Sequence, residues 1–191
     1  MSASDGDLVR DVRRGNPDAF GELVQRYQGR LFALVLMMVR QRSAAEEVTQ
    51  DTFVRAYRHI HRYDVERAFY PWLAAIAVRL AQNWFRRRSR EVRRQEELKV
   101  IPDRLSFAGP LTSLVANERS RRLWSMVAAL PSGERTAVFL YYRDEMAIGD
   151  IARALGVTTG TIKTLLFRAR RHLRERFQTA PSLREETHHD V

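Results

Sequence analysis

The sequence predicts an all-α protein made of two small helical domains joined by a flexible linker. Apolar residues recur at spacings of three and four along almost the whole chain, which is the period of an amphipathic helix. No stretch alternates apolar and polar residues as a half-buried strand would. From Arg90 to Thr112 the helical period fades and charges of both signs crowd together. Pro102, Gly109 and Pro110 interrupt the same stretch, so we place the linker there.

The periodicity divides the chain into five segments and predicts where their helices lie. The segments are a lead at residues 1–15, an N-terminal domain at 16–89, the linker at 90–112, a C-terminal domain at 113–177 and a disordered tail at 178–191. Helices are predicted near 17–38, 43–60, 69–88, 114–130, 132–143, 147–155 and 158–176. Pro17 suits a first helical turn, and Ser43 is an expected N-cap that forms a capping box with Glu46.

The charge of the chain predicts a polyanionic partner. Its 191 residues include 33 Lys and Arg against 23 Asp and Glu, which gives a formal net charge of +10. Such a charge indicates nucleic acid or an anionic membrane surface, and a basic protein without such a partner is the alternative.

Composition argues against several functional classes. The absence of cysteine excludes a disulfide framework, a thiol nucleophile and cysteine-ligated zinc. The five histidines form no ligand-spaced group with acidic residues, so we expect no metal, no cofactor and no enzymatic activity. The polar start Met1–Gly6 is unlike a signal peptide, and the apolar run Leu31–Val39 is about half the length that spans a bilayer. We therefore expect a cytoplasmic protein that is not an integral membrane protein.

The segment from Met146 to Arg171 has the pattern of a helix-turn-helix. Gly156 suits the turn because it adopts a positive φ at little cost, and Thr158 can cap the recognition helix, Thr158 to Arg171. The predicted inward residues are Ile162, Leu165, Leu166 and Ala169, and the outward ones are Thr161, Lys163, Thr164, Phe167, Arg168, Arg170 and Arg171. We expect the outward face to read the major groove of DNA. A helical hairpin with a solvated basic face is the alternative.

Aromatic and basic residues stand side by side around the third predicted helix. They are Tyr63, Phe69, Tyr70, Trp72, Arg79, Asn83, Arg86, Arg87 and Arg88. This combination suits single-stranded nucleic acid, because aromatic rings stack on bases and cations pair with phosphates. In the alternative, the aromatic residues belong to the core and the cations complement the helix dipole.

The second predicted helix carries a local acidic face around Glu46, Glu47, Gln50 and Asp51. An acidic patch would repel DNA and would suit a basic protein surface. Acidic residues near a helix start also complement the helix dipole, so the residues alone leave both explanations open.

The order of these parts resembles the extracytoplasmic-function subfamily, or group IV, of bacterial RNA polymerase sigma factors in the sigma-70 family. The resemblance covers residues 17–176. Residues 44–57 are similar to the clamp-binding helix of the family, and residues 69–77 and 83–88 to its promoter-melting segment. Leu130-Pro131, Arg135 and residues 150–152, 160–163 and 167–171 are similar to its −35-reading domain.

The resemblance implies an alternative sigma factor that directs promoter-specific transcription initiation, in a stress or envelope response. The two domains would be sigma domains 2 and 4. The implied contacts with the β′ clamp coiled-coil of core RNA polymerase are Glu47, Gln50, Asp51 and Phe53. The implied −10 contacts are Tyr63, Phe69, Tyr70, Arg79, Asn83, Arg86, Arg87 and Arg88. The implied −35 contacts are Thr158, Gly160, Thr161, Lys163, Thr164, Phe167, Arg168 and Arg171.

The resemblance also implies further partners and some differences from the family. Besides promoter DNA, the partners would be the β flap of the polymerase and an anti-sigma factor, and the linker would thread the polymerase cleft. Arg79 stands where many members carry Asn, Leu165 replaces a frequent Arg, and Ala147 replaces a frequent Ser or Thr cap. The −10 and −35 sequences therefore cannot be carried over from the family. The remaining alternative is a helix-turn-helix regulator that acts without joining the polymerase.

Overall fold

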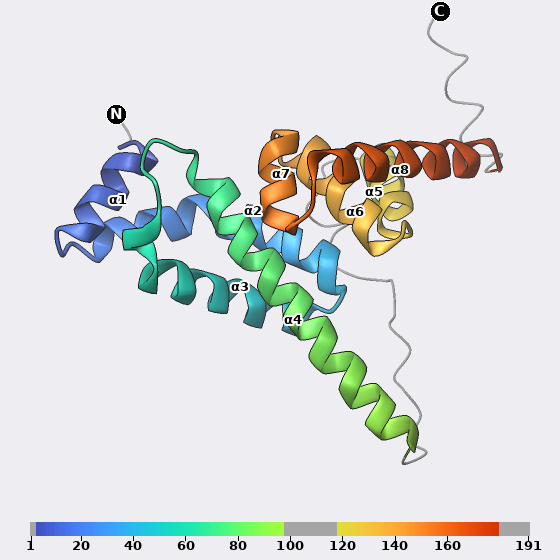
Figure 1. The fold of residues 1–191 in the computed structure, drawn as a ribbon, viewed down its shortest axis with the longest axis horizontal. Helices are drawn as coiled ribbons and strands as arrows, with labels where there is room; N and C mark the ends of the chain where they lie inside the picture. Colours follow the sequence, from blue (N-terminus) through green and yellow to red (C-terminus); the bar gives the residue numbers. More distant parts are fainter. Residues whose placement is uncertain (1–2, 98–117, 180–191) are drawn as a thin grey trace, which may run out of the picture.

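The computed structural model describes residues 3–97 and 118–179, with side chains at 3–90 and 123–178. Both ranges are helical and contain no strand, which confirms the predicted all-α fold for the described part of the chain. The N-terminal domain consists of α1 (Asp5–Arg13), α2 (Asp18–Val39), α3 (Arg42–Arg58), the 3₁₀ turn η1 (Ile60–Arg62) and α4 (Phe69–Glu97). The C-terminal domain consists of α5 (Glu118–Ala128), α6 (Ser132–Val138), the π-helical turn η3 (Phe139–Arg143), α7 (Ile148–Leu155) and α8 (Thr159–Thr179), as Figure 1 shows.

Helix α1 was missed by the prediction, which treated residues 1–15 as a lead. The Ser4 hydroxyl caps this helix by accepting a hydrogen bond from the Asp7 backbone N–H at 3.2 Å. Leu8, Val9 and Val12 are buried against the rest of the domain. A helix of nine residues shows barely two turns of periodicity, and its stability comes from packing on α2 and η1.

The predicted capping box at the start of α3 is wrong. The helix begins at Arg42, after Gln41 as an N-cap that makes no side-chain cap hydrogen bond. Because Ser43 lies inside the first turn, its hydroxyl accepts a hydrogen bond from the Gln41 amide instead. Glu46 pairs with Arg42 one turn earlier, with 2.9 Å between Nε and Oε1.

Helix α4 continues eight residues beyond the predicted domain boundary, from 90 to 97. This segment carries Arg, Glu and Gln, which are good helix formers. The mixed charge that marked the start of the linker is therefore compatible with helix. The rest of the predicted linker, residues 98–112, and most of the predicted tail, residues 180–191, lie outside the described residues.

The C-terminal domain departs from regular α-helix in one turn. The predicted helix at 132–143 is α6 followed by η3, where the Asp144 backbone N–H donates to the Phe139 carbonyl, five residues back, at 3.1 Å. The core of this domain contains Val127, Leu130, Phe139, Leu140, Ile151, Ala152, Ile162, Leu166 and Ala169.

The two domains pack against each other. Helix α7 lies against α4, and α6 lies against α2 (Figure 1). Within the two described ranges, no helix has the length and apolar content needed to cross a membrane.

Candidate functional site

The helix-turn-helix has the predicted local geometry. Gly156 ends α7 in the left-handed conformation, with a φ of 69°. The Thr158 hydroxyl accepts a hydrogen bond from the Thr161 backbone N–H at 3.2 Å, which satisfies one of the free donors at the start of α8. Ala147 caps α7 without any side-chain hydrogen bond, as its replacement of a hydroxyl residue implies.

The two faces of α8 separate as predicted. Ile162, Leu166 and Ala169 are buried and Leu165 is half-buried. The outward residues are exposed, and they are Thr158, Gly160, Thr161, Lys163, Thr164, Phe167, Arg168, Arg170 and Arg171. Phe167 is 66% exposed, so its ring is available to a partner rather than to the core.

Several outward side chains of α8 are already oriented by neighbours. The Thr164 hydroxyl donates to the Gly160 carbonyl at 3.0 Å. Arg170 donates to the Tyr142 hydroxyl at 2.8 Å and lies near that ring. Lys163 and Arg168 make no hydrogen bond or ion pair with another described residue, so their charges can meet an anionic partner. This face can accept a DNA groove.

The outward face of α3 combines acidic and apolar residues. Glu47, Gln50 and Asp51 are exposed, as predicted for a protein contact. Val54 and Tyr57 lie one and two turns farther along the same face and are 48% and 46% exposed. The sequence analysis did not include these two residues in the contact face. Val54 stands four residues after Gln50, and Tyr57 stands three residues after Val54. This helical spacing was the signal that could have found them.

Phe53 does not belong to this contact face, contrary to the prediction. Its side chain is buried, and its ring packs edge-on against Phe20 of α2, with 6.4 Å between the ring centroids.

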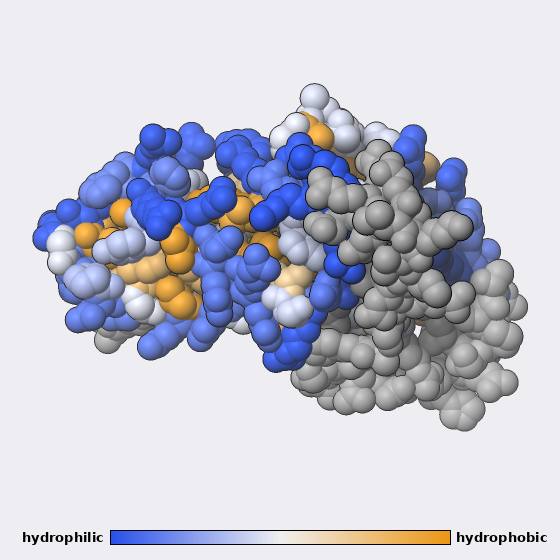
Figure 2. All heavy atoms as spheres, turned by 90° about the horizontal axis from the view of Figure 1, so that it is seen from below, coloured by the Kyte–Doolittle hydropathy of each residue, from blue (hydrophilic) through white to orange (hydrophobic). Residues whose placement is uncertain are grey.

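Seen from below, the face over α3 shows hydrophobic atoms surrounded by hydrophilic ones (Figure 2). We call Glu47, Gln50, Asp51, Val54 and Tyr57 the α3 surface.

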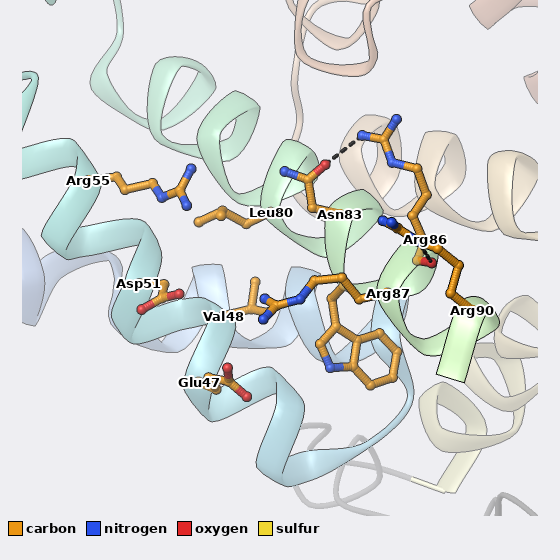
Figure 3. Close-up of a pocket in the computed structure, with 10 residues that line it drawn as sticks. Glu47, Val48, Asp51, Arg55, Leu80, Asn83, Arg86, Arg87 and Arg90 are labelled. Atoms are coloured by element: carbon orange, nitrogen blue, oxygen red, sulfur yellow. Dashed lines mark hydrogen bonds between the residues drawn. The ribbon is translucent and has the colours of Figure 1, made fainter. Parts of the chain in front are cut away.

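A shallow groove lies between α3 and the second half of α4. Figure 3 shows Glu47 and Asp51 on the α3 side, and Asn83, Arg86 and Arg87 on the α4 side. The Asn83 amide oxygen accepts a hydrogen bond from Arg86 at 2.5 Å. The structure therefore places two of the predicted polymerase contacts and three of the predicted −10 contacts on the two sides of one groove.

The predicted aromatic contacts lie in the core in this arrangement. Phe69 is fully buried, with its ring centroid 5.3 Å from Tyr63, 5.5 Å from Tyr27 and 5.6 Å from Trp72. Tyr63 is also buried, and its hydroxyl donates to the Arg67 carbonyl. Aromatic rings have large apolar areas, so burying Tyr63 and Phe69 in the core is more favourable than exposing them to solvent. Phe69 is thus a core residue in this structure, which favours the alternative interpretation of the aromatic residues.

Tyr70 is buried for a different reason, because its hydroxyl reaches the C-terminal domain and donates to Asp144. The basic residues of the predicted −10 set, in contrast, are exposed along α4. They are Arg79, Arg86, Arg87 and Arg88, with Asn83 among them.

The loop between η1 and α4 is fixed by α1. The Arg13 guanidinium donates to the Ile60 carbonyl at 2.9 Å and also to the Tyr63 carbonyl. It thereby adds a charged donor to two backbone carbonyls at the end of η1. Sequence reasoning missed Arg13 because its partners, Ile60 and Tyr63, lie 47 and 50 residues away in the chain.

Replacing Arg13 with Met is expected to lower the unfolding free energy of the domain by about 1.5 kcal/mol, because two carbonyls lose a charged donor. Urea unfolding followed by circular dichroism measures this change. Arg14→Met is the control, since Arg14 makes only an exposed ion pair with Asp11 and should change stability by less than about 0.5 kcal/mol. Equal losses in the two variants would contradict the assigned role of Arg13.

Two family models match the chain in the order of its domains. The model described as Sigma-70 region 2 matches residues 23–91, and the model described as Sigma-70, region 4 matches residues 120–173. The first covers α2 to α4, and the second covers the helix-turn-helix and the helices that support it.

Curated relatives match almost the full length. The chain is 30% identical over 190 residues to the RNA polymerase sigma-H factor of Pseudomonas aeruginosa, covering 95% of this chain and 96% of the relative. It is 29% identical to the ECF RNA polymerase sigma factor SigW of Bacillus subtilis, covering 89% of this chain and 95% of the relative. These two family models and two relatives cover both domains. They do not support the alternative of a regulator that has only the helix-turn-helix.

Solved structures share the fold. One is CnrH in complex with the cytosolic domain of CnrY, at 23% identity and a TM-score of 0.65, covering 92% of this chain and 97% of that one. Another is the sigma factor RpoE in complex with the anti-sigma factor NepR from Bartonella quintana, at 22% identity and a TM-score of 0.65, covering 84% and 96%. With both regions matched and full-length relatives found, the chain belongs to the extracytoplasmic-function group of the sigma-70 family of RNA polymerase sigma factors.

Proposed function

We propose that three surfaces of this alternative sigma factor, which directs promoter-specific transcription initiation, each bind a different partner. The α3 surface would bind core RNA polymerase, the basic face of α4 would hold the −10 element, and the outward face of α8 would read the −35 element. The observation that carries the proposal is the separation of faces on α8, where an apolar buried side and a polar, basic exposed side begin at a capped turn.

The start of α8 is the part best suited to base edges. In helix-turn-helix proteins the N-terminal residues of the recognition helix enter the major groove. Lys163 can donate to guanine, and the methyl groups of Thr161 and Thr164 can pack on thymine. Arg168 and Arg171 lie farther along the helix, where phosphate contacts set the register.

Lys163→Ala and Arg171→Ala are expected to weaken −35 binding in different ways. Loss of a base contact costs about 1–3 kcal/mol and relaxes sequence preference at one position. Loss of a phosphate contact weakens binding to all sequences and lowers the slope of log K against log salt by about 1. Competition binding to selected and scrambled duplexes over a salt series separates these effects. If Lys163→Ala weakens all duplexes equally, the base-reading role is wrong.

On the −10 side, Arg79, Asn83 and Arg86–Arg88 would grip the phosphates and edges of the melted strand. Five exposed polar side chains along α4, four of them cationic, suit an unpaired and flexible strand. The buried residues Tyr63 and Phe69 would act by holding the loop 63–68 in place. The identity of the recognised base depends on Arg79, which replaces the Asn of many relatives.

The α3 surface suits a basic protein partner, and we propose the β′ clamp coiled-coil of the polymerase. Its acidic residues would meet cations, and Val54 and Tyr57 would supply apolar contact area. The C-terminal domain would contact the β flap. We place the protein in the cytoplasm, where core polymerase acts.

An anti-sigma factor is the proposed regulator, acting in a stress or envelope response. Both solved relatives described above are complexes, one with the cytosolic domain of CnrY and the other with the anti-sigma factor NepR. A partner of this kind would cover the α3 surface and so compete with the polymerase.

Run-off transcription tests the proposed function most directly. The protein would be combined with core polymerase and a library of randomised promoters. We expect transcripts from a subset that shares one −35 and one −10 sequence. Failure to form an open complex on any template would contradict the assignment of the three surfaces.

A further inference from the structure

Helix α1 lies beside the loop 63–68, which leads from η1 into α4 (Figure 1). This helix, which the sequence did not predict, precedes residues 23–91, the range that the Sigma-70 region 2 model matches. Gly6, Arg10 and Arg13 of α1 are spaced by four and three positions, so they share one face of the helix. Each of them meets a group of η1 or of the loop, and that face of α1 therefore follows the loop.

Two arginines hold the loop from this face. At the C-terminal end of α1, the Arg13 guanidinium donates to the carbonyls of Ile60 and Tyr63, where the loop begins. One turn earlier, Arg10 lies 3.6 Å from the Glu66 carboxylate, measured between Nη2 and Oε1. The Arg10 pair is exposed, so it contributes little. The Arg13 clamp is thus the stronger of the two contacts.

At the other end of the same face, α1 approaches the backbone of the loop closely. A Cβ at Gly6 would lie 3.3 Å from the Val65 carbonyl oxygen, which is closer than side chains normally come to a backbone atom. Glycine makes a helix less stable than alanine does. The glycine in the first turn of α1 therefore lowers the stability of the helix and leaves room for the loop.

The loop is closed on itself by hydrogen bonds. The Asp64 carboxylate accepts a hydrogen bond from the Glu66 backbone N–H at 3.1 Å and another from Arg67 Nε at 3.1 Å. The Arg67 backbone N–H donates to the Asp64 carbonyl at 3.1 Å, and the Arg67 carbonyl accepts from the Tyr63 hydroxyl. Because these bonds join the loop into one unit, a displacement at Val65 or a release at Tyr63 moves the whole unit.

The other side of α1 is attached to α2, which makes the helix a firm support. The Asp5 carboxylate accepts hydrogen bonds from the Tyr27 hydroxyl and from Arg26. Burial and the neighbouring Asp5 carboxylate raise the pKa of the Tyr27 hydroxyl, so it remains a donor at neutral pH. The centroid of the Tyr27 ring lies 5.5 Å from that of Phe69, the first residue of α4. The support of the loop is thus connected to the helix that carries the proposed −10 contacts.

The loop and α4 line the same groove. Asp64 and Arg67 of the loop line it together with Trp72 and Arg79 of α4, and both arginines are exposed. An unpaired base in this groove would meet groups from the loop and from α4 at once. The position of the loop therefore sets the distance between the two groups of contacts.

We propose that α1 is a positioning element for base recognition at the −10 element. The Arg13 clamp and the close approach at Gly6 set the position of the loop 63–68 against α4. This inference rests on the proposed function, because it requires the melted −10 strand to lie along α4. Both residues act through the loop rather than on the DNA. Hydrogen bonds weaken steeply when their geometry is poor, so a displaced loop loses discrimination between bases.

Base discrimination by the holoenzyme tests the proposal. Wild type or Arg13→Met would be combined with core polymerase and bound to forked duplexes. These carry the −10 sequence selected by run-off transcription, or one wrong base at each unpaired position in turn. A wrong base weakens specific binding by roughly 5- to 150-fold. We expect Arg13→Met to lower this ratio by about threefold to tenfold, the cost of losing about one hydrogen bond to a base. The ratio does not depend on the fraction of folded protein, so a loss of stability alone leaves it unchanged.

Gly6→Val separates the position of the loop from the stability of α1. Valine is a better helix former than glycine, so α1 should remain folded. Its side chain would press on the Val65 carbonyl and displace the loop, so discrimination should fall as in Arg13→Met. The control is Gly21→Val, because Gly21 is exposed on α2 and a Cβ there meets nothing within 4 Å. Arg14→Met is the control for Arg13, and both controls should discriminate as wild type does.

Hydrogen exchange of the backbone amides at 64–67, measured on the free full-length chain, gives a readout without DNA. We expect faster exchange in Arg13→Met and Gly6→Val and wild-type exchange in the two controls. Wild-type discrimination or wild-type exchange in both α1 variants overturns the proposal, and so do equal losses in the variants and their controls. If wild type itself discriminates at no unpaired position, the −10 role in the proposed function is wrong, and the inference is overturned with it.

Discussion

Replacing Gln50 with Ala and Asp51 with Arg together is expected to remove most of the affinity for core RNA polymerase. Both side chains are exposed on α3 and make no hydrogen bond or ion pair with another described residue, so the helix should fold normally. Reversing a charge in a complementary interface costs about 2–5 kcal/mol, which corresponds to a loss of roughly 30-fold or more. Biolayer interferometry with immobilised core polymerase measures this loss.

The matched control for that variant is Glu22→Arg. Glu22 is exposed on α2, and its replacement changes the net charge of the same domain by the same amount as Asp51→Arg. This control should bind polymerase nearly as well as wild type, and thermal melting should show both variants folded. Normal polymerase binding by the Gln50 and Asp51 variant would show that the α3 surface is not the contact.

Phe69→Ala is expected to lower the unfolding free energy by about 3–5 kcal/mol, which is the usual cost of removing a buried phenyl group. The ring is fully buried and contacts Tyr27, Tyr63 and Trp72, so its removal leaves a cavity in the middle of an aromatic cluster. Chemical unfolding followed by tryptophan fluorescence measures the loss, because Trp72 belongs to the cluster.

The control is Phe167→Ala on the outward face of α8. This ring is 66% exposed, so its removal should change stability by less than about 0.5 kcal/mol. The two phenylalanines thus separate a core role from a contact role. If Phe69→Ala kept normal stability and lost only promoter melting, Phe69 would be a DNA contact after all.

Local periodicity predicted α8 well and long-range contacts not at all. Ile162 and Leu166 repeat at helical spacing beside Lys163 and Arg168, so one helix turn already separates the faces. The burial of an aromatic residue could not be predicted from its type. Phe69 and Tyr57 are both large and apolar, yet Phe69 is buried and Tyr57 is half-exposed. Only the tertiary packing of α2, α3 and α4 decides between them.

The side-chain contacts between distant segments could not be predicted from the sequence either, because they also depend on tertiary packing. Arg30, Tyr70 and Asp144 come from three distant points of the chain, and no motif indicates that they contact one another. Arg13 likewise acts on the carbonyls of Ile60 and Tyr63, which no side-chain pattern reveals. Helix ends were predicted less well than helix interiors, as Ser43 shows.

The π-helical turn η3 determines the direction in which Asp144 projects. A hydrogen bond from residue 144 to residue 139 includes one residue more than an α-helical turn would. Each residue advances the chain by about 100° around a helix axis. Deleting one residue from 139–143 would restore the regular spacing and rotate Asp144 away from Arg30 and Tyr70. The one extra residue in this turn is therefore what allows the two domains to pack in the observed orientation.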